Sequence, residues 1–169
     1  RLTRSHVDMP LQAGAEVAAL PLSGAASFSK DTQRVALLTD HNQAAIWDLS
    51  ANSEVAKLPI EGPGNPAVAL SADGRQAATY LYFNDNKWVQ VWDLAQNQVR
   101  TLKPQLGVSH IICAEFSPDG KLLAAGFQFQ QVSVWDLSRG RIKFEFNQPP
   151  FMMKVIALTY SADSRMLAV

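Results

Sequence analysis

Acidic side chains recur along the chain and are the first candidates for chemistry. Each of four segments carries an aspartate two residues after a serine, and a further aspartate follows a tryptophan directly in three of them: Asp31, Asp73, Asp119 and Asp163, then Asp48, Asp93 and Asp136. Carboxylates could bind calcium, but several oxygens would have to converge on one point. Because each repeated segment supplies its acids at its own place, we expect these aspartates to form turns, and we predict no metal.

A cysteine and a histidine three residues apart are the other reactive pair. Cys113 is the single cysteine of the chain, and His110 precedes it. On a strand the two side chains would point to opposite faces, and Cys113 lies in the apolar run IICAEF. We therefore expect a buried, inert thiol. A disulfide within the chain or a cysteine-based zinc site is excluded, and no motif for a cofactor or an active site appears, so we predict a protein that is not an enzyme.

The elements that position these residues form an internal repeat. Its copies start at Phe28, Leu70, Phe116 and Tyr160, which are 42, 46 and 44 residues apart. A self-similarity of this length that ends on Trp-Asp predicts a propeller blade of four strands. Two further features recur, the alanine eight residues after each start and the tryptophan of a Trp-Asp-Leu triplet in the first three copies: Ala36, Ala78, Ala124 and Ala168, and Trp47, Trp92 and Trp135.

Local patterns within each copy predict antiparallel strands. The segments 111–116 and 155–160 are short and apolar, and each stops at a turn. Gly120 of the Ser-Pro-Asp-Gly turn can take the positive φ that reverses the chain. Thr32 and Ser164 stand at this glycine position in two other copies, so those turns must change type or bear strain. We expect the small alanine of each copy to mark where neighbouring sheets approach most closely.

With FSPDGKLLAAG, VQVWDL and VSVWDL in view, the chain resembles the WD-repeat family of β-propellers over nearly all of its length. The resemblance implies an all-β propeller of four-stranded antiparallel blades around a central channel, with surfaces that hold partner proteins. The family's Gly-His pair is absent, and only Asp40 and Asp85 remain as candidates for its turn aspartate. The hydrogen-bonded tetrad of the family is therefore incomplete, and we expect apolar packing to hold these blades together.

The repeat divides the chain into about four blade equivalents. The sequence of residues 5–22 resembles that of residues 46–60, with Val7, Asp8 and Met9 at the places of Trp47, Asp48 and Leu49. We expect a larger ring, since rings of the family have about seven blades, or an eight-bladed ring formed by two copies. The predicted units are the second half of a blade at 5–22, three blades at 24–60, 66–103 and 111–147, and the first half of a blade at 155–169.

Composition excludes several classes of partner. The chain has 169 residues, 47% of them apolar, and its 15 basic residues balance 15 acidic ones. A net charge of zero argues against nucleic acid or an anionic membrane as partner. No apolar run approaches the roughly 20 residues that span a bilayer, and the first residues contain no signal core. We expect a cytoplasmic location.

Aromatic residues gather where the copies differ most. The segment TYLYFNDNKW at 79–88 carries a three-residue insertion between the second and third strands of its copy. In the family this loop opens onto the top face, and exposed aromatic anchors are typical of partner-binding surfaces. We predict one apolar patch with members from this loop, from the equivalent loop of the next copy and from the connection after Pro150: Tyr80, Tyr82, Phe83, Trp88, Phe127, Phe129, Phe151, Met152 and Met153.

These observations favour a non-catalytic scaffold for protein–protein interaction, with other proteins or peptides as partners. Two alternatives remain open. The chain could be an accessory or regulatory propeller domain of a larger enzyme or signalling protein, or a periplasmic propeller similar to TolB. The intact Trp-Asp-Leu triplets favour the WD-repeat interpretation over the periplasmic one.

Overall fold

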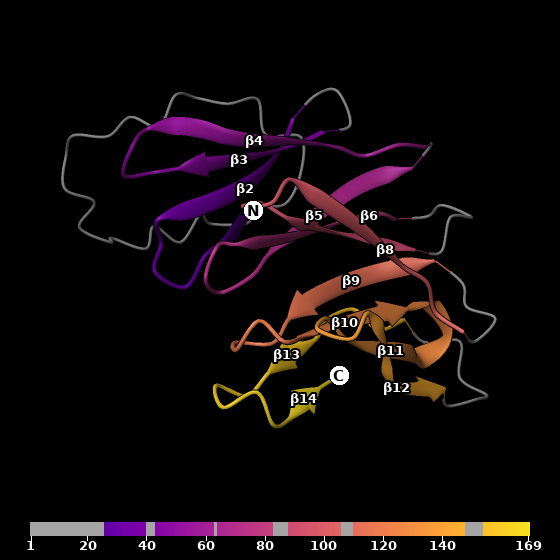
Figure 1. Ribbon diagram of the computed structural model, residues 1–169. Helices are drawn as coiled ribbons and strands as arrows, with labels where there is room; N and C mark the ends of the chain where they lie inside the picture. Colours follow the sequence, from indigo (N-terminus) through magenta and orange to yellow (C-terminus); the bar gives the residue numbers. More distant parts are fainter. Residues whose placement is uncertain (1–25, 40–42, 63, 83–87, 106–109, 148–153) are drawn as a thin grey trace, which may run out of the picture.

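The protein is described by a computed structural model that covers residues 26–39, 43–62, 64–82, 88–105, 110–147 and 154–169. Strands and turns make up these residues, with one short 3-10 segment. Figure 1 shows the units stacked in chain order, from the first sheet to the hairpin near the carboxyl end. The first unit is a four-stranded antiparallel sheet with the order β1 (Ser27–Phe28), β2 (Arg34–Thr39), β3 (Gln43–Asp48) and β4 (Ser53–Pro59).

The second and third units repeat this antiparallel meander. The second consists of β5 (Asn65–Leu70), β6 (Gln76–Tyr82), β7 (Val89–Asp93) and β8 (Gln98–Leu102). The third consists of β9 (Ile111–Phe116), β10 (Leu122–Phe127), the 3-10 segment η1 (Gln128–Gln130), β11 (Gln131–Asp136) and β12 (Arg141–Asn147). A hairpin of β13 (Thr159–Tyr160) and β14 (Leu167–Ala168) follows.

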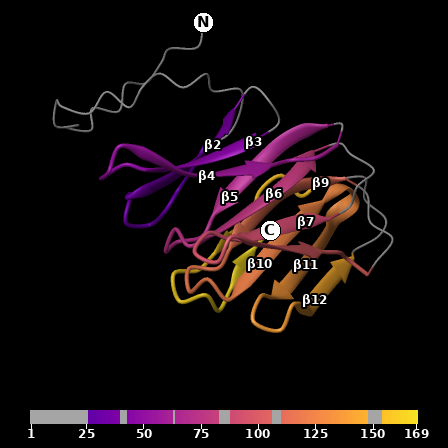
Figure 2. The ribbon, with the colours of Figure 1, turned by 45° about the horizontal axis from the view of Figure 1, so that its top comes forward.

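The units face one another in succession, as the turned view in Figure 2 also shows. A single parallel bridge between Tyr82 and Ile111 joins the second and third units into one eight-stranded sheet. The described strands do not close into a ring. The predicted all-β architecture of four-stranded antiparallel blades is confirmed, while the predicted half-blade at 5–22 lies outside the described residues.

Apolar packing between units forms the core. Successive side chains of a strand point to opposite faces of its sheet. Each sheet therefore directs one set of side chains toward the preceding unit and the other set toward the next unit. In β11, Trp135 packs toward the second unit, whereas Val132 and Val134 pack toward the hairpin, as the VSVW pattern predicts. Three apolar clusters result, one at each junction between successive units. This arrangement agrees with blades that are held together by apolar side chains buried between facing sheets.

The turns that open each unit have one backbone form. A positive φ occurs at Gly74 (67°) and Gly120 (69°). The same position has φ 56° in Thr32 and 61° in Ser164. The first and fourth copies therefore keep the turn type and accept left-handed backbone at a residue with a side chain, one of the two outcomes predicted for them.

Small residues let the third unit approach the hairpin. Ala124 is fully buried in the cluster with Val132 and Val155. Two residues further on there is no room for a side chain, because a Cβ added to Gly126 would lie 2.4 Å from Val155 Cγ1 and 2.9 Å from Cys113 Sγ. Only a residue without a side chain fits there.

Candidate partner-binding site

The repeated aspartates are bound within their own turns. In the third unit the Ser117 hydroxyl donates to Asp119 Oδ1 at 2.6 Å and accepts from the Leu122 amide at 2.9 Å, while the Lys121 amide donates to the same carboxylate at 3.1 Å. The other three turns repeat the serine-to-aspartate hydrogen bond at 2.6 or 2.7 Å, between Ser29 and Asp31, Ser71 and Asp73, and Ser161 and Asp163. These carboxylates cap turns, as the sequence predicted.

The aspartates after tryptophan organise the hairpins between third and fourth strands. Asp48 Oδ1 accepts from the Ser50 hydroxyl at 2.6 Å and from the Ala51 amide at 2.9 Å. Asp93 and Asp136 accept from backbone amides in the same way. Hydroxyl donation keeps the pKa of Asp48 and Asp136 below the ordinary value of 3.8. Within the described residues no group of three or more His, Cys, Asp and Glu side chains could hold a metal ion.

Cys113 is half-buried rather than fully buried as predicted, and it packs against the apolar cluster between the third unit and the hairpin. Its Sγ donates to the Val155 carbonyl at 3.4 Å, and burial raises its pKa to about 11. A thiol with a raised pKa carries little thiolate at neutral pH and is a poor nucleophile. The His110 carbonyl accepts from the Gln128 amide at 3.0 Å, so the backbone of this histidine supports the β10–β11 connection.

The tryptophans of the repeat differ in whether the indole Nε1–H group has a hydrogen-bond acceptor. Trp92 Nε1 donates to Thr79 Oγ1 at 2.9 Å. In the first unit Leu37 stands at the position of Thr79, and the buried Nε1 of Trp47 has no hydrogen-bond partner. Among the described residues, the Trp92–Thr79 pair is a hydrogen bond that the first unit lacks at the equivalent position. The two candidate turn aspartates, Asp40 and Asp85, lie outside the described residues.

The predicted aromatic patch is divided by the structure. Tyr80 and Phe127 are buried in the cluster between the second and third units. For these two the predicted surface role is wrong, because alternation on β6 and β10 turns both rings into the core. Other predicted members lie outside the description: the side chain of Tyr82, and Phe83, Phe151, Met152 and Met153.

Trp88 and Phe129 are the predicted anchors that reach the surface. Trp88 is half-buried, and Lys103 Nζ lies 5.7 Å from the centre of its ring. Phe129 is 44% exposed at the tip of the β10–β11 connection. Strand register puts both at one end of the units, here called the top end, where β6 meets β7 and β10 meets β11.

Phe129 has a strained backbone. Its φ is 64° and that of Gln130 is 54°, so two consecutive residues with side chains are left-handed. Such a conformation is uncommon outside glycine, and it is most unfavourable for a bulky residue. The sequence predicts a role for the Phe129 ring but not the strained backbone. The segment FQFQQ contains no glycine, so nothing in it indicates a left-handed turn.

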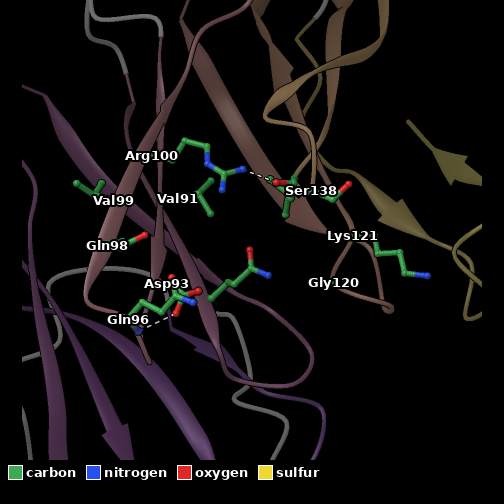
Figure 3. A pocket seen from close by; sticks show the side chains of 11 residues that line it. Val91, Asp93, Gln96, Gln98, Val99, Arg100, Gly120, Lys121 and Ser138 are labelled. Carbon is green, nitrogen blue, oxygen red and sulfur yellow. Dashed lines mark hydrogen bonds between the residues drawn. The ribbon is translucent and has the colours of Figure 1, made fainter.

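A pocket of about 280 Å³ with a mixed polar and apolar lining lies at the junction of the second and third units (Figure 3). Its lining includes Arg100, Lys121 and Asp93. The Arg100 guanidinium donates to the Leu137 carbonyl of the next unit, and the Asp93 carboxylate is used by its own hairpin. These contacts connect neighbouring units at the end opposite the top end.

The sequence of the chain is similar to that of a known WD-repeat protein. The chain is 29% identical over 119 residues to the WD repeat-containing protein 26 homolog of Arabidopsis thaliana, a match that covers 69% of the chain and 19% of that protein. The WD-repeat resemblance is confirmed. The chain therefore spans about a fifth of the length of this WD-repeat relative. No family model matches the chain.

A solved structure supports the propeller fold. Kuenenia stuttgartiensis Hydrazine Synthase superimposes with a TM-score of 0.63 over 84% of this chain and 41% of that chain, at 15% identity. At this identity the similarity is one of fold. Within the described ranges of the chain, no helix has the length and hydropathy to cross a membrane.

The structure also exposes two aromatic residues that sequence reasoning did not select. Phe144 and Phe146 stack on β12 with ring centroids 6.5 Å apart. The signal was present in KFEF, because two phenylalanines two residues apart share one face of a strand.

Proposed function

We propose that this WD-repeat segment is a non-catalytic interaction platform whose top end holds a partner protein, with Phe129 as the anchor. The observation that carries the proposal is an exposed phenylalanine at φ 64°. Backbone strain of this kind costs about 1–3 kcal/mol and clusters at functional sites. A loop selected for stability alone would place glycine there, so the strained aromatic supports a role in binding.

The neighbouring hairpin end adds a complementary feature. Trp88 at the end of the β6–β7 connection presents an indole with the Lys103 ammonium over its ring. An aromatic ring beside a cation suits a partner surface with an apolar pocket and an acidic rim. WD-repeat proteins generally bind other proteins, which agrees with this class of partner.

Two observations favour binding over catalysis. The repeated carboxylates are engaged by serine hydroxyls and backbone amides of their own turns. The thiol of Cys113 is held protonated by burial. The accessory-domain alternative shares this non-catalytic role for the segment itself, and a partner enzyme would then occupy the top end.

Site-specific photo-crosslinking tests the proposal. A photoreactive residue at position 129 should capture one partner in cells, and the same residue at Val55, which is exposed on β4, should not. Phe129→Ala should weaken binding of the purified partner at least about tenfold, which corresponds to about 1.4 kcal/mol. Capture at both positions alike, or unchanged affinity of the Phe129→Ala variant, would overturn the assignment.

A further inference from the structure

The two junctions between four-stranded units differ at the bottom end, which is the end opposite the top end. At the junction of the first and second units, Arg34 Nη1 donates to the Gly74 carbonyl at 2.8 Å. A Cβ added to Gly74 would lie 3.0 Å from Arg34 Cδ, so the stem of the arginine covers this turn. The arginine therefore closes the bottom of the first junction.

The second junction has a shorter side chain at the same position. Gln76 is the equivalent of Arg34, because each pairs with the aspartate after tryptophan and donates its amide to the turn serine. Gly120 is the equivalent of Gly74, yet nothing lies within 4 Å of a Cβ added there. The pocket of about 280 Å³, here called the junction pocket, has Gln76 and Gly120 in its lining. It therefore takes the place that an arginine fills at the first junction.

A second difference brings a guanidinium into the wall of the junction pocket. Arg100 holds the ladder position that Ala56 holds in the first unit. Its Nη1 donates to the Leu137 carbonyl, and Figure 3 shows the side chain reaching from β8 toward the third unit. Arginine has five N–H donors in a planar fork, so this bond leaves donors for a ligand.

The carboxylates beside the pocket are used by their own hairpins. Asp93 lines the pocket, and its Oδ1 accepts from the Ala95 amide at 3.0 Å and from the Gln96 amide at 2.9 Å. Asp136 of the third unit accepts from the Ser138 hydroxyl at 2.6 Å. These hydrogen bonds disperse negative charge into the turns, which leaves the Arg100 guanidinium as the strongest charged donor in the wall.

Lys121 adds a second cation at the rim of the pocket. Its side chain is 77% exposed, and Nζ lies 3.8 Å from Asp119 Oδ2. An exposed ion pair of this length contributes little, and the flexible stem of lysine lets the ammonium turn toward a ligand. A cationic ligand would meet both Lys121 and Arg100, whereas an anionic ligand would be attracted by both.

We propose that the junction pocket binds the carboxylate of a peptide segment from a partner protein. Arg100 would donate to the carboxylate, the pairing for which the guanidinium fork is best suited. Gln76 and Gln98 present amide groups that can donate to and accept from the peptide backbone. Val91 and Leu137, which also line the pocket, offer an apolar surface to a neighbouring side chain.

The size of the pocket agrees with a ligand of this kind. Ligand pockets start at about 300 Å³, so a pocket of about 280 Å³ admits one side chain with its adjacent backbone and excludes a large cofactor. Phe129 lies at the top end, so the segment would contact partners at two opposite ends.

Peptide titration of the full chain, followed by nuclear magnetic resonance, tests the class of ligand. The probes are acetyl-Leu-Glu-Leu-amide and matched peptides with Gln or Lys in the middle. The Glu peptide should bind at least about fivefold more tightly than either. An acetylated dileucine with a free terminal carboxylate tests a chain end as the source, and binding of either carboxylate peptide supports the proposal. Equal affinity for the Glu, Gln and Lys peptides would overturn it.

Two variants test the location. Arg100→Gln should weaken binding of the Glu peptide at least about fivefold, whereas Arg141→Gln should not, because Arg141 is exposed on β12 outside the pocket lining. Since Arg100 also links two units, the second variant is Gln76→Phe, which fills the pocket without changing its charge.

Gln76→Phe should also lose binding at least about fivefold while the melting temperature is kept. Unchanged affinity in either variant would overturn the proposal. All of these measurements are independent of Phe129, so failure of the top-end role would leave their result unchanged.

Discussion

One serine hydroxyl in each opening turn serves two hydrogen bonds at once. It donates to the aspartate two residues later and accepts from the amide that begins the second strand. The turn therefore satisfies its own polar groups, and in the first three units the serine is buried beneath it. Because buried polar groups are costly without partners, serine is required wherever the turn is covered by a neighbouring unit.

Replacing Ser117 tests this account. Ser117→Ala leaves the Leu122 amide without its acceptor and should lower the free energy of unfolding by about 1–3 kcal/mol. The matched control is Ser161→Ala, since Ser161 makes the same bonds at the more exposed hairpin. Chemical denaturation of both variants measures the difference. A loss at position 161 equal to that at 117 would contradict the role of burial.

Acid should destabilise the protein through the same turns. The Ser117 hydroxyl bond keeps the pKa of Asp119 below its ordinary value of 3.8. A carboxyl with a lowered folded pKa stabilises the fold above its unfolded pKa, and this contribution is lost as pH falls through the folded value. Burial raises the pKa of Glu115, whose protonation acts in the opposite sense.

We therefore expect the free energy of unfolding to fall as pH drops below about 3.8. The Asp119→Asn variant cannot titrate at this position, so its loss over the same interval should be smaller than that of the unmodified protein. Urea denaturation at a series of pH values measures both slopes. Identical slopes would exclude Asp119 as a contributor.

The indole of Trp92 gives a third test at the residue scale. Thr79→Val keeps the shape of the side chain but removes the oxygen that accepts from Nε1 at 2.9 Å. Thr79 is buried, so the orphaned indole should cost about 1–3 kcal/mol. In a Trp92→Phe background the same substitution should cost much less. A double-mutant cycle by thermal melting would reveal additivity if the bond contributed nothing.

At the scale of strands, glycine sets the distance between β10 and the chain that follows β12. Gly126→Ala would put its Cβ 2.4 Å from Val155 Cγ1, so the sheets must separate. We expect a loss of about 1–3 kcal/mol from overpacking, partly restored by adding Val155→Ala. Gly120→Ala is the control, because nothing lies within 4 Å there and only its positive φ opposes a side chain. Differential scanning calorimetry compares the three.

The sequence predicts the strands well because their signals are local. Ser-x-Asp turns and Trp-Asp-Leu triplets each mark a strand boundary, and alternation within β11 predicts that Trp135 faces away from Val132 and Val134. Left-handed backbone at Thr32 is one of the two outcomes that its equivalence to glycine leaves open. The exposure of a single ring is not local, however. Tyr80 and Phe129 are both aromatic residues near hairpins, and only the pairing of neighbouring strands buries the first and exposes the second.

At the scale of the molecule, the units are held by successive apolar interfaces, as in other repeat proteins. The repeat predicts this stacking, because a blade cannot bury both faces alone. It does not predict which face remains open. The exposure of the stacked pair on β12 is a tertiary feature. Phe144 and Phe146 are exposed, whereas Leu102, which pairs in the same way in the second unit, is buried.

The left-handed backbone at Phe129 lowers the stability of the fold, while its exposed ring is the proposed anchor for a partner. Phe129→Gly would relieve a φ of 64° and should raise the melting temperature, although the freer unfolded chain offsets part of the gain. The same change removes the ring and should abolish capture of the partner. Phe129→Ala would lose the ring and keep the strain. A glycine variant that melts higher than the alanine variant, with both unable to bind, would show that the fold gives up stability to present this side chain.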